Sequence, residues 1–189
     1  MPGLTAGYVL TGGRSSRFGS DKALLDWHGR PLVLHVAERV RLAAGSVTLV
    51  GAPERYAHLG LDVIPDAVTG AGPLGGVVTA LAHTTASWNL VTACDMPGLT
   101  AAFLVGLLEC ASATDADILL PHDSEGRPEP LCAVYHARCR PALESALGAG
   151  IRKMTDAFTE LRVVAVRVLD PALLANVNTP GDAPGGLNG

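Results

Sequence analysis

The stretch LTGGRSSRFGSDK, from Leu10 to Lys22, decides the fold. It follows an apolar run, residues 7–10, that has the character of a buried strand, and it carries the cations Arg14, Arg17 and Lys22. A glycine-rich turn after a strand can point successive backbone N–H groups into a concavity, and neighbouring positive charges can hold a triphosphate there. We therefore expect a phosphate-binding loop at the end of the first strand.

This loop differs from a Walker A motif. Gly19 is followed by Ser20 and Asp21 before Lys22, so the spacing G-x-x-x-x-G-K-[ST] is not met. The alternative is a flexible surface turn whose charges are solvated, and Arg14 fits that alternative best. The position directly after the first strand favours phosphate binding.

Further apolar runs alternate with helix-length segments on both sides of this loop. Buried strands are expected at 47–50, 61–64 and 90–93, and helices at 32–44, before Gly45, and at about 74–83. Strand, helix and strand in series predict right-handed crossovers and a mostly parallel, three-layer α/β sheet. The pattern changes after about residue 114, where strands at 118–120, 131–135 and 163–168 and a helix around 142–147 are expected.

Composition excludes several classes of protein. The 189 residues are 48% hydrophobic and 17% charged, as in one globular domain, and the net charge of −4 provides no basic field for nucleic acid or acidic lipid. The longest apolar stretch, 101–108, is too short to span a bilayer, and the N-terminus resembles a first strand rather than a signal peptide. The cysteines form no C-x-x-C pair, which fits a reducing cytosol: Cys94, Cys110, Cys132 and Cys139.

A second informative segment is TACDMPGL, residues 92–99, in which Asp95 follows a run that should lie in the sheet centre. A carboxylate there is costly unless it meets a cation, and magnesium on a triphosphate is a natural partner. The alternative is that Asp95 caps the following helix or turn. Cys94 is expected to be a packed thiol, because no base is adjacent to make it a nucleophile.

The third segment, VIPDAVTGAGPLGG at 63–76, partly matches a dinucleotide-binding fingerprint. Gly70, Gly72 and Gly75 fit G-x-G-x-x-G, and Asp95 follows at a suitable distance. The glycines do not follow the strand immediately, however, and the loop after the first strand is the better phosphate site. We expect Asp66 to face the nucleotide, the alternative being a simple Pro-Asp turn.

Together these segments resemble molybdenum cofactor guanylyltransferases, the MobA-type nucleotidyltransferase family. The likeness is carried by LTGGRSSRFGSDKALL, GRPLVLHV, VIPDAVTGAGPLGGV, TACDMPGL, GRPEPLCAVY and, at 176–180, NVNTP. It implies a Rossmann-like α/β nucleotidyltransferase fold that transfers GMP from GTP to the phosphate of molybdopterin, with Mg²⁺ as the cofactor and pyrophosphate as the product. The resemblance also implies transient contact with other cofactor-biosynthesis proteins or acceptor molybdoenzymes.

The resemblance assigns roles to particular residues. Asp95 would hold magnesium and contribute to catalysis with Arg17 and Lys22, and the nucleotide would be bound by Leu10, Thr11, Gly12, Gly13, Lys22, Asp66 and Asp95. Asn176 and Asn178 would serve the pterin side, the alternative being Asx turns. We expect one domain over 1–182, with nucleotide binding mainly in 1–114, acceptor binding mainly in 115–182, and a disordered tail at 183–189.

Two departures from the family pattern and three rival functions remain. The helix that usually follows the NVNTP segment in the family is not expected here. Gly51 or Ala52 stands where the family often has Asn after the second strand, whereas Thr11-Gly12-Gly13, in place of Ala-Ala-Gly, favours guanine over cytosine. The rivals are a cytidylyltransferase or other small-phosphate nucleotidyltransferase, a GTP-binding module without turnover, and an NAD-dependent oxidoreductase that uses the 70–75 glycines.

Overall fold

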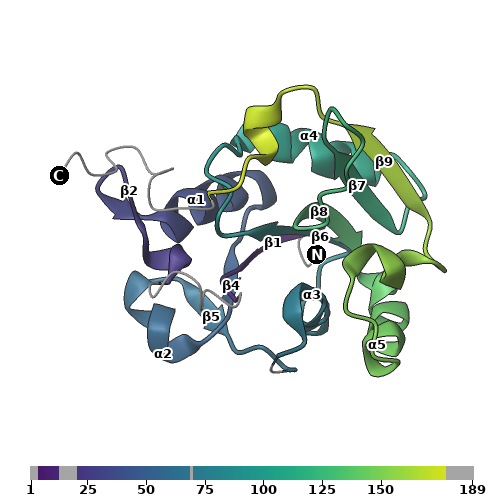
Figure 1. The fold of residues 1–189 in the computed structure, drawn as a ribbon, viewed down its shortest axis with the longest axis horizontal. Helices are drawn as coiled ribbons and strands as arrows, with labels where there is room; N and C mark the ends of the chain where they lie inside the picture. Colours follow the sequence, from purple (N-terminus) through teal and green to yellow (C-terminus); the bar gives the residue numbers. More distant parts are fainter. Residues whose placement is uncertain (1–3, 13–20, 69, 178–189) are drawn as a thin grey trace.

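The centre of the molecule is a sheet built around β1 (Thr5–Leu10) and β6 (Trp88–Ala93). The computed structural model describes residues 4–12, 21–68 and 70–177, and within them seven strands pair in the order β5-β4-β1-β6-β8-β7-β9 (Figure 1). Strand β8 runs antiparallel to both its neighbours, β6 and β7, and the other neighbouring pairs are parallel. The expected mostly parallel sheet is therefore confirmed. The remaining strands are β4 (Thr48–Val50), β5 (Asp62–Ile64), β7 (Ile118–His122), β8 (Cys132–His136) and β9 (Val163–Arg167).

Helices cover both faces of the sheet and make three layers. The pair α1 (Leu32–Ala44) and α4 (Ala101–Ser112) packs together on one face, and α3 (Gly72–His83) and α5 (Arg140–Gly148) pack together on the other (Figure 1). Short elements complete the chain: the hairpin β2 (Asp26–Trp27) and β3 (Arg30–Pro31), α2 (Pro53–Tyr56), and the 3-10 turns η2 (Lys22–Leu24), η3 (Ala57–Leu59), η4 (Ala137–Cys139), η5 (Met154–Phe158) and η6 (Pro171–Leu174).

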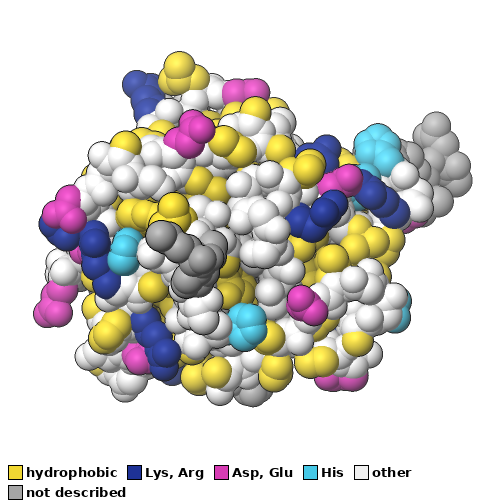
Figure 2. Space-filling model, turned by 180° about the vertical axis from the view of Figure 1, so that it is seen from behind, with side chains coloured by type: hydrophobic (Ala, Val, Ile, Leu, Met, Phe, Trp, Pro, Cys, Tyr) yellow, Lys and Arg dark blue, Asp and Glu magenta, His cyan; other side chains and the backbone are white. Residues whose placement is uncertain are grey.

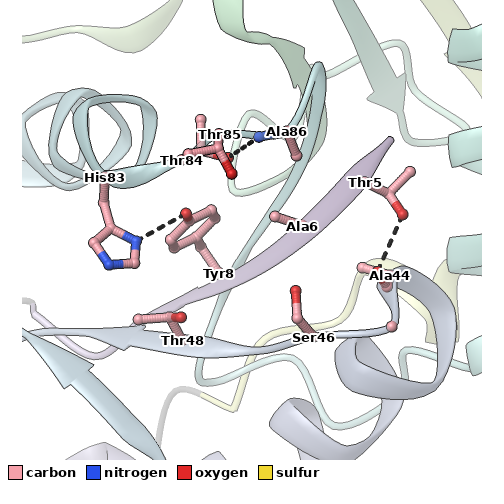
Figure 3. Close-up of a pocket in the computed structure, with 11 residues that line it drawn as sticks. Thr5, Ala6, Tyr8, Ala44, Ser46, Thr48, His83, Thr84, Thr85 and Ala86 are labelled. Carbon is pink, nitrogen blue, oxygen red and sulfur yellow. Dashed lines mark hydrogen bonds between the residues drawn. The ribbon is translucent and has the colours of Figure 1, made fainter. Parts of the chain in front are cut away.

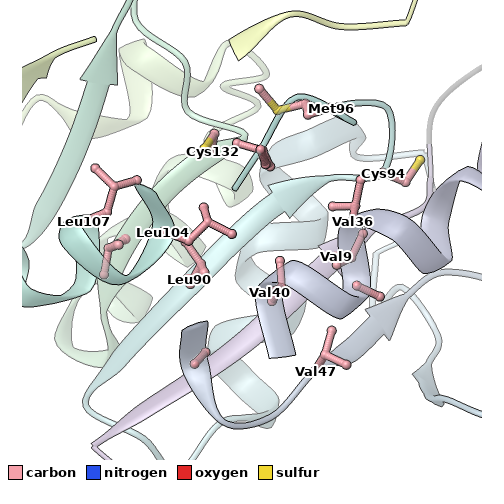
Figure 4. Packing of buried hydrophobic residues seen from close by; sticks show 14 of the residues in the cluster. Val9, Val36, Val40, Val47, Leu90, Cys94, Met96, Leu104, Leu107 and Cys132 are labelled. Carbon is pink, nitrogen blue, oxygen red and sulfur yellow. The ribbon is translucent and has the colours of Figure 1, made fainter. Parts of the chain in front are cut away.

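Two hydrophobic cores follow from the alternation of side chains along the strands. In β1, Val9 faces α1 and α4, whereas Tyr8 and Leu10 face α3 and α5. Figure 4 shows the first core, in which Val9 lies with Val36 and Val40 of α1. Each fully buried Val or Leu contributes about 1.5–3 kcal/mol relative to exposure. Burial on both faces explains why the central strands are continuous apolar runs.

Most predicted elements are present, with shifted ends. Helix 32–44 is confirmed, and it stops at Gly45, whose positive φ of 79° lets its N–H bond to Arg41 O. Helix α3 begins two residues before the predicted start, because Gly72 and Pro73 form its first turn. The β2–β3 hairpin was not expected. Residues 183–189, predicted to be a disordered tail, lie outside the described residues.

The amino ends and the carboxyl ends of the parallel strands are lined by different residues. At the amino ends of β1 and β4 lies a hollow of about 470 Å³, drawn in Figure 3, where Tyr8 Oη lies 3.1 Å from His83 Nδ1. The described residues that line it include none of those predicted to bind nucleotide.

Over the face in Figure 2, acidic and basic side chains are interspersed. No helix in the described part of the chain is long and apolar enough to cross a bilayer.

Asp117, just before β7, connects this strand to the segment before β9 and to the segment after β8. Its carboxylate accepts a hydrogen bond from Arg162 N at 2.8 Å and forms an ion pair with Arg138. Burial raises the pKa of this carboxyl, but the Arg162 N–H and the Arg138 guanidinium outweigh burial and lower the pKa overall. The charged form is thus stabilised by folding.

We predict that Asp117→Asn lowers the free energy of unfolding by about 1–2 kcal/mol at pH 7, because the charge-assisted hydrogen bonds are lost. A lowered native pKa gives stability above the unfolded pKa of about 3.9 that is lost as pH falls through the native pKa. The difference between wild type and variant should therefore shrink below about pH 4. Urea unfolding at several pH values measures it, with exposed Asp115→Asn as the control; equal effects of the two substitutions would contradict the prediction.

Candidate active site

The predicted site loops meet at the carboxyl edge of the parallel strands. Thr11 follows β1 and Asp95 follows β6, and β1 pairs with β6 up to the register Leu10↔Ala93. The pairing of β1 continues one step beyond the strand on both sides, since Cys94 N donates to Leu10 O at 3.1 Å next to β6 and Thr11 N donates to Val50 O of β4 at 3.0 Å. The loops therefore leave the sheet side by side, as expected for carboxyl ends of parallel strands.

Lys22 and Asp95 form the central contact of the site. Lys22 Nζ lies 3.4 Å from Asp95 Oδ2, and each side chain is 22% exposed. The ammonium also donates to Val177 O at 3.0 Å, while Val177 N donates to Asp95 O at 2.8 Å. The cation that the semi-buried Asp95 requires is thus supplied, in this structure, by the lysine of the first loop.

Asp95 does not cap the next helix, which was one part of the alternative interpretation. Thr100 holds that position, and its Oγ1 accepts a hydrogen bond from Phe103 N at 3.2 Å at the start of α4. The Asp95 carboxylate instead points toward Lys22. Its side chain is therefore available to a site and is not consumed by a helix end.

Asp21 anchors the lysine, and sequence reasoning gave it no role. Its Oδ1 caps η2 by accepting from Ala23 N at 3.1 Å, and its Oδ2 accepts from Tyr56 Oη at 2.7 Å. Burial and the Asp21 carboxylate raise the pKa of Tyr56, so the phenol remains a donor. An Asp before a helical turn was a usable signal for the cap, but the partner Tyr56 could not be inferred from spacing.

Gly51 explains the departure from the family pattern after the second strand. A Cβ at Gly51 would lie 2.0 Å from Thr11 Oγ1 and 3.1 Å from the Tyr56 ring. Thr11 Oγ1 is committed to Val50 O at 3.0 Å, and the residue is buried. A side chain at position 51 would therefore displace Thr11, and the predicted contact of Thr11 with nucleotide would have to come from its backbone.

Asp66 lies close to Gly12. A Cβ built on Gly12 would come within 3.2 Å of Asp66 Oδ2, so the absence of a side chain at position 12 keeps this approach open. Asp66 is exposed, and partial desolvation of its carboxyl raises the pKa of that group. The predicted nucleotide residues Gly12 and Asp66 are therefore neighbours.

Glu129 is an acidic residue of this edge that sequence reasoning missed. It is half-buried, and its Oε1 accepts a hydrogen bond from Leu131 N at 3.2 Å. Burial raises the pKa of its carboxyl, the negative charge of Asp95 adds to this, and a hydrogen bond with the Asn176 side chain opposes it. The predicted acceptor residue Asn176 thus lies beside a carboxylate close enough to Asp95 to sense its charge.

Three predicted site residues cannot be placed: Gly13, Arg17 and Asn178 lie outside the described residues. In the described part of the chain, no three His, Cys, Asp or Glu side chains gather closely enough to hold a metal ion. Magnesium nevertheless fits Asp95, because this ion commonly takes one or two carboxylates together with phosphate oxygens and water.

Comparisons with known proteins show what the chain is similar to. Residues 7–163 match the model of the MobA-like NTP transferase domain. A probable molybdenum cofactor guanylyltransferase of Deinococcus radiodurans is 37% identical over 92% of this chain and 89% of its own, and one of Trichormus variabilis is 40% identical over 96% and 89%. The crystal structure of molybdopterin-guanine dinucleotide biosynthesis protein A from Archaeoglobus fulgidus superposes with a TM-score of 0.80, at 29% identity and 94% coverage of both chains.

Cys94 and Cys132 lie inside the first core (Figure 4), where burial raises the pKa of both thiols. Burial also raises the pKa of Cys139, to about 12.

We predict that iodoacetamide at pH 8 modifies Cys110 of the native protein first, since Cys110 is the partly exposed thiol among the four. Peptide mass spectrometry measures this, with urea-unfolded protein as the control. Rapid native labelling of Cys94 would contradict the packed-thiol interpretation.

Proposed function

Because the chain belongs to the MobA-like NTP transferase family, we propose that it transfers GMP from GTP to the phosphate of molybdopterin and releases pyrophosphate. The chain is a nucleotidyltransferase. The observation that carries the finer proposal is the Lys22–Asp95 pair at the carboxyl end of the central strands β1 and β6. The choice of guanine and of the molybdenum cofactor in this proposal comes from the names of its relatives.

In this proposal the protein positions the two substrates and neutralises phosphate charge. The reaction needs no covalent intermediate with the protein. An oxygen of the acceptor phosphate attacks the α-phosphorus of GTP, and the bond to the pyrophosphate oxygen breaks. Lys22 stabilises the charge that grows on the pyrophosphate, and Arg17 assists from the same loop. Asp95 would hold magnesium, which when bound neutralises phosphate charge. Cys94 has no part in the chemistry, because its thiol is buried.

The nucleotide is proposed to lie over the β5–β4–β1 side of the edge. Leu10, Thr11, Gly12 and Gly13 would approach it through their backbone, and Asp66 would contact the nucleoside. Leu10 and Thr11 support a backbone role, because both side chains are buried in the protein. The acceptor would lie over residues 115–182, near Asn176 and Asn178. We expect this activity in the reducing cytosol, with transient contact to proteins that supply or receive the cofactor.

We predict that Lys22→Ala and Asp95→Ala each lower the single-turnover rate of GMP transfer about 100- to 1000-fold, because each removes a charge preorganised for the transition state. Pyrophosphate release in the presence of GTP, magnesium and molybdopterin measures the rate. Lys153→Ala is the matched control, since this lysine is exposed and pairs only at the surface with Asp156. Near-wild-type rates in either site variant, with the fold intact by circular dichroism, would contradict the assigned roles.

We also predict selective, magnesium-dependent binding of GTP over CTP, ATP and NADH. The glycine loop and Asp66 form the nucleotide side, and Asp95→Ala should weaken binding by removing the metal carboxylate. Isothermal titration calorimetry with and without magnesium measures this. A preference for CTP would retain the reaction type but replace guanylyl transfer, and binding of NADH alone would contradict the phosphate-loop assignment.

A further inference from the structure

Strand order fixes the side of the site on which Glu129 lies. Strand β6 lies between β1 and β8, so the segment that leads into β8 is on the opposite side of Asp95 from the loop after β1. Because β8 is antiparallel to β6, with Thr92↔Cys132 in register, this segment reaches the same edge as Asp95. Ala93 N donates to Leu131 O at 2.7 Å, which holds it there. Glu129 is thus next to Asp95 and away from Gly12 and Asp66.

The Glu129 carboxylate is held in place. Glu129 N donates to Pro121 O at 2.8 Å and its carbonyl accepts from Cys132 N at 3.1 Å, so the backbone is fixed on both sides. The side chain accepts from Leu131 N, and the Asn176 side chain lies close enough to lower the pKa of the carboxyl. An ionised carboxylate offers about four lone-pair positions, so these two partners leave it the capacity to accept from a ligand.

The chemistry of this group restricts what it can recognise. A carboxylate beside Asp95 repels phosphate, so Glu129 is unsuited to bind the triphosphate or the acceptor phosphate directly. An ionised carboxylate accepts hydrogen bonds and does not donate them, and it pairs best with two adjacent N–H donors in a bidentate arrangement. On the acceptor side, the 2-amino-4-oxopyrimidine ring of a pterin presents such a pair, its ring N3–H and its 2-amino group.

We propose that Glu129 recognises the acceptor by accepting two hydrogen bonds from this edge of the pterin ring, with Asn176 positioning the carboxylate. The inference deepens the proposed function and rests on it. It assigns acceptor specificity to a residue outside the glycine loop and the Asp95 turn. Guanine carries the same pair of donors, but the strand order puts the nucleotide residues Gly12 and Asp66 on the other side of Asp95.

The test compares 6-hydroxymethylpterin phosphate with 6-hydroxymethyllumazine phosphate, in which a carbonyl replaces the 2-amino group. Each is titrated by fluorescence into the full chain with magnesium and α,β-methylene-GTP, which cannot be cleaved at the α-phosphorus. Wild type should bind the pterin about 10- to 100-fold more tightly than the lumazine, because the lumazine loses a donor and turns an oxygen toward the carboxylate.

Glu129→Gln should weaken pterin binding about 10- to 100-fold and abolish or reverse the preference, since its amide can donate to the lumazine carbonyl. Glutamine keeps an oxygen for Leu131 N, and the thermal midpoint checks the fold. Glu125→Gln is the matched control: Glu125 is exposed in the same connection and pairs with Arg127. It should behave as wild type.

The remaining outcomes overturn the inference. Equal wild-type affinity for pterin and lumazine would show that no carboxylate reads this edge. A Glu129→Gln variant with weakened binding of the GTP analogue, or with a shifted magnesium requirement, would assign the residue to the nucleotide or the metal. Failure of the proposed function is distinct, because it appears as wild-type protein that does not bind the GTP analogue selectively over other nucleotides.

Discussion

The pairing of β1 with β6 in the middle of the sheet is the constraint on which the rest of the structure depends. Because the two strands are parallel and in register up to Leu10 and Ala93, the glycine loop and the Asp95 turn emerge together. A carboxylate at the end of a buried strand needs a countercharge, and Lys22, the first residue of η2, provides it. Asp21 and Tyr56 then fix the turn that carries the lysine. Sheet geometry and the electrostatics of one buried edge thus produce the site together.

Much of the fold could be predicted because apolar periodicity is strong where both faces of a strand are buried. The start of β6 was missed for a clear reason: Asn89 is polar, yet it is fully buried and donates to Ala86 O and Tyr135 O. The β2–β3 hairpin was missed because its turn uses His28 and Gly29 at positive φ, in place of the more typical Asn-Gly. The antiparallel direction of β8 depends on its pairing with β6 and β7, and no local pattern encodes it.

The same division applies to the site. Lys22, Asp66 and Asp95 could be named from sequence, because each follows a strand predicted to be parallel and the carboxyl ends of such strands share an edge. Gly51 and Glu129 could not be named from sequence, because their roles arise from neighbours that are distant along the chain. The neighbours of Gly51 are Thr11 and Tyr56, and those of Glu129 are Asp95 and Asn176. A residue's type predicts what it can bind, whereas its partners decide whether it is placed to do so.

The backbone of Val177 bonds to both charged residues at the centre of the site. Its N–H bonds to the carbonyl of Asp95 and its carbonyl accepts from Lys22, so one peptide segment holds both charged residues. The turn after Asp95 packs tightly on the same part of the chain, since a Cβ at Gly98 would lie 1.8 Å from Ala172 O. A ligand that shifts residues 171–177 must therefore also disturb the charge pair. In the proposed function, acceptor binding that shifts this segment would therefore change the affinity for the nucleotide, and such a coupling is reciprocal.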